Sequence, residues 1–320
     1  MMNKLRTALE KRPIKLSFSL VDYFNDLFTS DNPDAIIEFY NSFKSRDQMI
    51  KWMKERPKGA SYIHEVEGRK DIIVVITTAD FNGKYARTCK EEIFKGLHMV
   101  FVESGGKEDF YFNSAHNVNV GIKKALEYDP KWVIFSSDDM YKIDDINVLI
   151  EQLSTINNQE IDVVFTQPSI YHSKPERTAE LNILGKIYFK YKHILKLYNK
   201  FGIKYNFCPP SGRFSKLFKK GYLHLEINDF GIFSGNFLKM FNGYLYDETF
   251  INGGEDSDIS LKFSMNPKKR AIINYKIGDY IGTTLGTGPT RGLRGILGLA
   301  YFNYKWSSKL DEIIKENSAF

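Results

Sequence analysis

Five consecutive apolar residues at positions 72–76 constrain the fold more strongly than any other feature of the chain. An unbroken apolar run of this length is typical of a parallel strand that is covered on both faces. Two further candidate strands follow at 99–102 and 132–135, and candidate helices at 86–96 and 118–128 separate the three. Because strands and helices alternate at this pitch, the sequence predicts an α/β fold with a mainly parallel sheet and right-handed crossovers.

The alternation continues towards the C-terminus. A candidate helix at 146–156 is followed by candidate strands at 161–166, 231–234 and 271–275, and the stretch from 282 to about 294, rich in Gly, Thr and Arg, is predicted to be a loop.

Three parts are expected along the chain. The N-terminal part is predicted to be helical, because Asn32 and Pro33 supply a cap and a first-turn proline and apolar residues recur at helical spacing. We therefore expect a helical N-terminal extension over residues 1–70, an α/β domain over 71–290 and a C-terminal tail over 291–320.

Composition limits the class of protein. With 320 residues, of which 42% are hydrophobic, the chain can bury a full-sized core. Cys89 and Cys208 lack the spacing of a metal knuckle or a redox pair, so we expect two reduced thiols. No apolar run reaches the roughly 18 residues that a membrane span needs, and the N-terminus lacks the apolar core of a secretion signal. A cytoplasmic protein is expected.

Basic residues gather in one segment. Residues 181–225 contain ten Lys or Arg and no acid, and apolar residues between 184 and 198 fall on one helical face. This pattern predicts a basic amphipathic helix that would lie on an anionic membrane at its inner, cytoplasmic face. The alternative is a core-packed helix with a solvated lysine face. Nucleic acid is a weaker third interpretation, because no binding module is recognisable.

Two acidic pairs carry the chemistry. Asp138 and Asp139 follow a candidate buried strand, and Glu255 and Asp256 follow a Gly-Gly turn at a probable helix start. Carboxylates at such positions are costly unless a cation binds them, and their oxygens suit Mg²⁺ or Mn²⁺. The simpler interpretation is a solvated turn for the first pair and first-turn helix charges for the second. Together the pairs favour a metal-dependent group-transfer enzyme.

Five blocks in this order resemble the family 2 glycosyltransferases of the GT-A fold, which include rhamnosyltransferase-like enzymes, over residues 71–290. The similar blocks are VITTAD at 75–80, VESGG at 102–106, AHNVNVGI at 115–122, SDD at 137–139, and the pair FNGYLYDE at 241–248 and GGEDSD at 253–258. The resemblance implies a mixed, mainly parallel sheet with helices on both sides, and inverting transfer of a sugar from a nucleotide donor.

The resemblance also assigns roles. Asp139 is the expected ligand of Mn²⁺ or Mg²⁺, and Asp138 would bond the nucleotide ribose or the water shell of the ion. Asp256 is the candidate base for the acceptor hydroxyl, and Glu255 would position the acceptor or tune its neighbour. The implied donor-binding residues include Thr77, Ala79, Asp80, Glu103, which would contact the nucleobase, and His116, which stands where the family has Arg.

The sequence departs from the family at three places. Ser137 replaces the first acid of the commoner Asp-x-Asp form, which predicts weak metal binding. The family often has a metal-binding His after the last core strand, but residues 275–282 contain none, and Asp279 is the candidate replacement. Arg291 and Arg294 would close over the donor diphosphate as part of a mobile loop, although a plain surface loop fits equally well.

The expected function is metal-dependent inverting glycosyl transfer to a glycan or a lipid-linked acceptor, with residues 181–225 docking the enzyme on the membrane. Two alternatives stay open. A sugar nucleotidyltransferase would need a Gly-rich phosphate loop after the first strand, where residues 77–84 contain a single Gly. A catalytically inactive nucleotide-sugar- or glycan-binding protein on the same fold would explain the missing His and the lost first acid.

Overall fold

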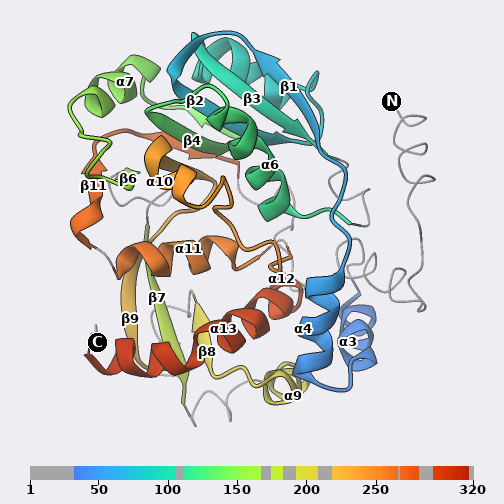
Figure 1. Cartoon of the computed structure of the whole chain (residues 1–320). Coiled ribbons are helices and arrows are strands. Elements are labelled where there is room, and N and C mark those ends of the chain that lie inside the picture. The colour runs from blue at the N-terminus through green and yellow to red at the C-terminus, as the bar shows by residue number, and fades with distance from the viewer. Residues whose placement is uncertain are drawn as a thin grey trace.

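A computed structural model describes residues 32–104, 111–166, 174–182, 192–207, 218–251, 253–265, 267–280 and 291–316. A mixed sheet lies at one end of the molecule, and a helical region that joins the N- and C-terminal parts of the chain lies at the other (Figure 1).

The central sheet has seven strands in the order β1-β3-β2-β4-β10-β6-β11. β2 pairs in parallel with β3 and β4, β6 pairs in parallel with β11, and β10 is antiparallel to both β4 and β6. β1 is antiparallel to β3 at the edge. The sheet is therefore mixed and mainly parallel, as predicted. Its strands are β1 (Tyr62–Val66), β2 (Arg69–Thr78), β3 (Leu97–Glu103), β4 (Trp132–Ser137), β6 (Val163–Thr166), β10 (Phe230–Ser234) and β11 (Arg270–Ile273).

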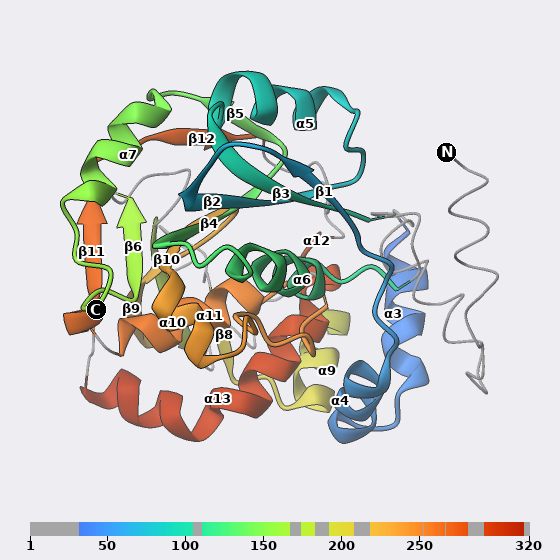
Figure 2. The ribbon, with the colours of Figure 1, turned by 45° about the horizontal axis from the view of Figure 1, so that its top comes forward.

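Helices cover both faces of this sheet (Figure 2). Alternate residues of β2 explain the arrangement: Val74 packs with α5 (Lys84–Thr88), the π-helix Cys89–Ile93 and α7 (Ile146–Ser154). Val75 packs on the opposite face with α6 (Ser114–Leu126), α10 (Gly235–Met240) and α11 (Glu255–Ser264). The apolar run at 72–76 is fully buried, as a strand covered on both faces must be.

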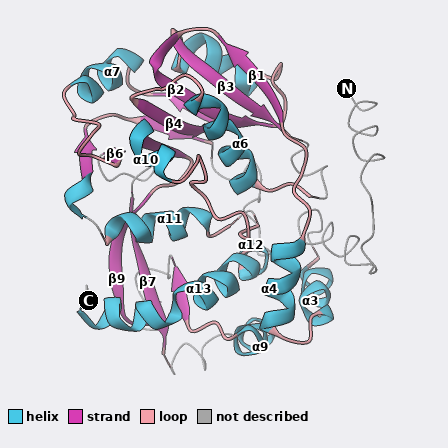
Figure 3. Ribbon diagram, viewed as in Figure 1, coloured by secondary structure: helices cyan, strands magenta, loops and turns pink. Residues whose placement is uncertain are grey.

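A second core joins the two ends of the chain. It is built by α3 (Pro33–Ser42), α4 (Arg46–Glu55), α9 (Lys192–Phe201), α12 (Arg291–Arg294), α13 (Ile296–Glu316) and the antiparallel sheet β8-β7-β9. The strands of that sheet are β7 (Lys174–Leu181), β8 (Tyr205–Phe207) and β9 (Phe218–Glu226), and Figure 3 shows them beside α13. The hydroxyl of buried Tyr40 donates to the carbonyl of Leu293 at 2.6 Å, which ties α3 to α12.

The secondary structure differs from the prediction at both ends. Residues 62–66, expected within a helical extension, form edge strand β1, whose side chains are mostly exposed and so leave no helical apolar pattern. The predicted α3 does begin at Pro33 with Asn32 as its cap, while residues 1–31 lie outside the described residues. Of the predicted loop at 282–294, residues 282–290 lie outside the described residues, and 291–294 form helix α12. A 21-residue helix, α13, follows it.

The basic segment is also built differently. Its described parts include strands β8 and β9 as well as helix α9, and Leu197, Tyr198 and Phe201 of α9 are buried in the second core. The alternative of a core-packed helix therefore holds for 192–201, because the apolar face finds partners within the chain. Residues 183–191 and 208–217 lie outside the described residues. In the part of the chain that the structure describes, no helix is both long and apolar enough to cross a bilayer.

Gly121 generates a testable prediction about the packing of α6. A Cβ atom at this position would lie 2.3 Å from Cγ1 of Val75 and 2.8 Å from Cγ2 of Val102, so helix and sheet meet at a distance that only glycine permits. We expect Gly121→Ala to lower the free energy of unfolding by about 1–3 kcal/mol in a denaturant titration. Gly292→Ala is the matched control, because a Cβ there would meet nothing within 4 Å. Equal midpoints for the two variants would show that α6 does not approach the sheet this closely.

Candidate active site

A cavity of about 200 Å³ lies where β2, β4, α6 and α11 meet. We call it the carboxylate cavity, because three acids line it: Asp229, Glu255 and Asp256. Thr77 at the end of β2 and Ser137 at the end of β4 also line it, together with apolar side chains that include Val118 and Phe135. The structure thus joins one predicted donor-binding residue, Thr77, to both predicted catalytic acids.

Strand register explains why these residues meet. Thr77 pairs with Ser137 in the parallel ladder of β2 and β4, so both strands end at the same edge of the sheet. β10 runs antiparallel to β4 and begins at that edge, and the Ser137 amide donates to the carbonyl of Asp229 at 3.0 Å. Sequence reasoning missed Asp229 because its place depends on this antiparallel pairing, which no local pattern revealed.

The Gly253-Gly254 turn presents the two catalytic candidates. Gly254 has φ +95° and precedes the first residue of α11, so the sharp bend inferred from the glycines is confirmed. A Cβ at Gly298 would lie 1.9 Å from the carbonyl oxygen of Gly253. Helix α13 therefore rests directly on the turn and fixes where Glu255 and Asp256 stand.

Glu255 is bonded on both carboxylate oxygens. It accepts from the Ser114 hydroxyl at 2.6 Å and from the Gly253 amide at 2.7 Å. Burial, and then the neighbouring charge of Asp256, raise the pKa of Glu255 above its usual range, although these two hydrogen bonds oppose the shift. A carboxyl with a raised pKa beside a second acid is a typical arrangement for proton transfer. Ser114 carried no signal in the sequence.

Tyr246 adds a neutral donor to the same cavity. Its side chain is buried, with an edge contact to Phe135 at a centroid distance of 5.9 Å. Burial, followed by the charges of Asp256, Glu255 and Asp229, raises the pKa of the Tyr246 hydroxyl, so it keeps its proton. Among the described residues, no hydrogen-bond partner reaches this hydroxyl.

The Asp138 carboxylate lies beside the end of β2. It accepts from the Thr78 hydroxyl at 2.5 Å. Burial raises the pKa of Asp138 to about 6; Thr78 opposes this shift, and Asp139 and Asp80 add to it. The carboxylate is therefore held at an energetic cost in the absence of a cation.

A two-stranded ribbon brings together the backbone segments that carry the two predicted metal ligands. β5 (Met140–Lys142) and β12 (Ile277–Asp279) are antiparallel, with Asp279 opposite Met140, and the Tyr280 amide donates to the Asp139 carbonyl at 3.0 Å. Asp139 directly precedes β5, so Asp139 and Asp279, 140 positions apart in the sequence, adjoin each other along the backbone of the ribbon.

The donor set suits a weakly held ion. Among the described residues, no group of three or more His, Cys, Asp or Glu side chains could hold a metal. Mg²⁺ is commonly bound by one or two carboxylates plus the phosphates of a substrate, so Asp139 and Asp279 fit an ion that arrives with a nucleotide diphosphate.

The remaining donor-binding candidates are spread over neighbouring positions. Ala79 and Asp80 are exposed in the turn after β2, where Asp80 accepts from the Asn82 amide. Glu103, at the end of β3, pairs with His64 of β1 at 2.7 Å, and the His64 ring stacks on Phe81 at a centroid distance of 4.4 Å. β1 thus supplies a partner that sequence reasoning had assigned to a helical extension.

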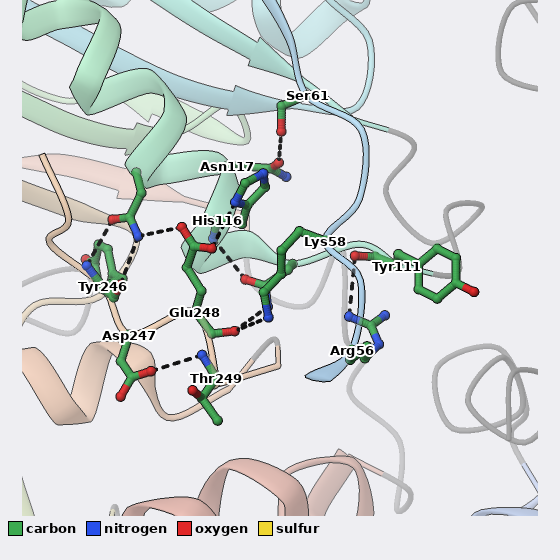
Figure 4. Close-up of polar contacts among 12 residues, drawn as sticks. Arg56, Lys58, Ser61, Tyr111, His116, Asn117, Tyr246, Asp247, Glu248 and Thr249 are labelled. Carbon is green, nitrogen blue, oxygen red and sulfur yellow. Dashed lines mark hydrogen bonds and ion pairs between the residues drawn. The ribbon is translucent and has the colours of Figure 1, made fainter. Parts of the chain in front are cut away.

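His116 belongs to a network beside the cavity (Figure 4). Its Nδ1 pairs with Glu248 at 3.0 Å, and the Asn119 amide donates to the other oxygen of Glu248 at 3.0 Å. Asn119 also accepts from the amides of Leu245 and Tyr246, so the backbone-bonding role predicted for it is confirmed.

The arginines predicted to form a mobile cover lie on helix α12 rather than in a loop. Arg294 is 6% exposed and so is held within the fold. The side chain of Arg291 lies outside the described residues. Arg294 therefore does not form a mobile lid, because the neighbouring Leu293 and Ile296 pack into the second core and fix this helix.

Asp138 generates a prediction about stability and pH. Its folded pKa of about 6 exceeds the usual value of an aspartate, so the folded protein loses stability as pH rises between these values. With EDTA present, we expect Asp138→Asn to stabilise the fold by about 2 kcal/mol at pH 8, and this gain should vanish near pH 4. Denaturant titrations at both pH values measure it. A loss of stability at pH 8 would instead identify Asp138 as a purely structural acid.

Comparison with known proteins adds no assignment to this geometry. No protein-family model matches the chain, and a search of curated proteins finds no match.

Proposed function

We propose that this protein is a metal-dependent glycosyltransferase of the GT-A fold that moves a sugar from a nucleotide donor to an acceptor hydroxyl. One observation carries the proposal: Thr77, Glu255 and Asp256, predicted from separate sequence blocks, line a single cavity at the carboxyl edge of the sheet. In open α/β sheets, ligands bind at this edge.

The reaction would be a single in-line displacement. The acceptor oxygen bonds to the anomeric carbon as the bond from that carbon to the diphosphate oxygen breaks, and the configuration inverts. Asp256 takes the proton of the acceptor hydroxyl. Glu255 positions the acceptor, and its two hydrogen bonds fix the carboxyl in place.

The leaving diphosphate accumulates negative charge. Asp139 and Asp279 would hold Mn²⁺ or Mg²⁺, which supplies the neutralising charge when bound. Asp138 would face the ribose or the water shell of the ion. Glu103, paired with His64, would contact the nucleobase.

A lipid-linked acceptor at the inner face of the membrane is part of the proposal. Because the apolar face of α9 is buried, only its lysine face, which includes exposed Lys196, can contact anionic lipid. Such contact would be electrostatic and would weaken with salt.

The catalytically inactive binding protein is the second candidate, favoured by the limited set of metal ligands among the described residues. It would bind the same donor and transfer nothing.

Donor binding is the first test. We expect one class of nucleoside diphosphate or nucleotide sugar to raise the melting temperature in the presence of Mn²⁺, because a ligand that binds only the native state stabilises it. Asp139→Ala should abolish this shift. Asp47→Ala, an exposed aspartate on α4, is the control for loss of one charge. If no nucleotide produces a shift, the transferase proposal fails.

Asp256 separates the enzyme from the inactive binder. We expect Asp256→Asn to lower turnover about 10²- to 10⁴-fold, because the acceptor proton loses its base, while the thermal shift with donor stays unchanged. Radiolabelled sugar transfer under saturating donor measures turnover. Full activity in the variant would remove Asp256 from the mechanism, and an inactive wild type that still binds donor would favour the binding protein.

A further inference from the structure

A second, more open cavity of about 460 Å³ lies against the segment 244–249. We call it the lysine cavity, because Lys54, Lys58, Lys262 and Lys305 line it. Tyr246 lines both cavities, so the two spaces are separated by about one side chain.

Four separate elements bring these lysines together. Lys54 lies in the last turn of α4 and Lys58 in the connection from α4 to β1, while Lys262 lies on α11 and Lys305 on α13. Figure 4 shows Lys58 next to Glu248, close to the start of α6. The cavity therefore lies where the central sheet domain meets the second core.

The two acids of the lysine cavity already have partners. Glu248 is bonded by His116 and Asn119. Asp247 accepts from Lys305 at 2.9 Å and from the Tyr301 hydroxyl at 2.9 Å. Burial alone would raise the pKa of Asp247, but these partners lower it to about 2. Both acids are therefore compensated within the fold.

Two of the lysines are likewise compensated. Lys305 contacts buried Asp258 at 2.9 Å in addition to Asp247, and Lys262 contacts Asp258 at 2.8 Å. Asp258, 1% exposed, also accepts from the indole of Trp306 at 2.7 Å. The contacts in this cluster hold α11 to α13, and its positive and negative side chains are paired with one another.

Lys54 and Lys58 differ from that pair. Among the described residues, no carboxylate lies within ion-pair distance of either ammonium. Lys58 donates to the carbonyl of Glu248 at 2.7 Å, and Lys54 lies 5.5 Å from the centroid of the Tyr304 ring. Burial, followed by the charge of Arg56, lowers the pKa of Lys58, and the charges of Glu248 and Asp247 oppose this shift. The half-buried ammonium of Lys58 therefore has no direct ion pair within the described part of the chain, whereas Lys54 is exposed to solvent. A phosphate in the cavity would add an ion pair to Lys58.

We propose that the lysine cavity binds a phosphate group carried by the acceptor. The term acceptor rests on the proposed transferase, but the anion site does not. Four lysines and two carboxylates line the cavity, so a neutral sugar would leave this excess of positive charge in place, whereas a phosphate presents several oxygens to ammonium groups that act as point charges. Since Tyr246 borders both cavities, a phosphate held here leaves the adjoining hydroxyl of the same molecule within reach of the carboxylate cavity.

Anion binding is measured directly with inorganic pyrophosphate, titrated into the full chain in EDTA by calorimetry. EDTA removes the metal on which a donor diphosphate would depend. We expect the double variant Lys54→Gln, Lys58→Gln to bind at least about tenfold more weakly than the wild type. Lys58→Arg should retain binding, because it keeps the charge. The charge-matched control is Lys268→Gln, at an exposed position in the 3-10 helix Pro267–Lys269. This variant and the separate variant Asp139→Ala should each bind like the wild type.

Two results would overturn the proposal: no binding by the wild type, or equal binding by the double variant. Sedimentation with phosphatidylcholine vesicles, with and without phosphatidic acid, identifies the source of the phosphate. If the wild type sediments with vesicles that contain phosphatidic acid and the double variant does not, the phosphate belongs to a lipid. If the wild type binds pyrophosphate but does not sediment with these vesicles, the phosphate belongs to a soluble molecule. Pyrophosphate binding without sugar transfer would remove the transferase and leave the anion site.

Discussion

The parallel pairing of β2 with β3 and β4 is the constraint on which the rest of the structure depends. Residues 72–76 are buried on both faces, so their backbone groups must be satisfied by strands on either side. Parallel strands that share a direction end at one edge, and the polar residues that follow each strand meet there. The carboxylate cavity is therefore a consequence of the sheet: Thr77 and Ser137 meet through register, and antiparallel β10 returns to the same edge to add Asp229.

Carboxylates at this edge of the sheet are buried, although their charged form is more stable in water. Burial raises the pKa of both Asp138 and Glu255, and the fold satisfies each with a hydroxyl, from Thr78 and from Ser114. A fold under selection for stability alone would gain by replacing such groups with neutral ones. Glu255 lines the carboxylate cavity with Asp256 and the neutral phenol of Tyr246, and this position favours a catalytic explanation over a structural one.

Local sequence patterns predicted the elements that carry their own signal. The apolar run at 72–76, the helix after Gly254 and the packing of Gly121 each depend on a few adjacent residues, and all three were found. What the sequence did not predict depends on distant partners. Strand β1 has mostly exposed side chains and is defined only by its pairing with β3. The amphipathic pattern of the basic segment predicted an apolar face on a membrane, but in α9 helices from both ends of the chain bury that face. Asp229 and Ser114 likewise line the carboxylate cavity because of contacts between residues that are far apart in the sequence.

The two cores meet through charge as well as packing. Asp258 lies two residues after the candidate base Asp256, yet it is buried and bonded to Trp306 and Lys305 of α13, while Gly298 of the same helix rests on the Gly253 carbonyl. The position of the Gly253-Gly254 turn is therefore set by a helix that lies outside the central sheet. The segment 244–249 lies between the acidic and basic spaces, with Tyr246 bordering both. A ligand that spans both cavities would have one end near the acids and the other near the lysines, and so would experience electric fields of opposite sign. These fields would orient a charged acceptor before any specific contact with its sugar is made.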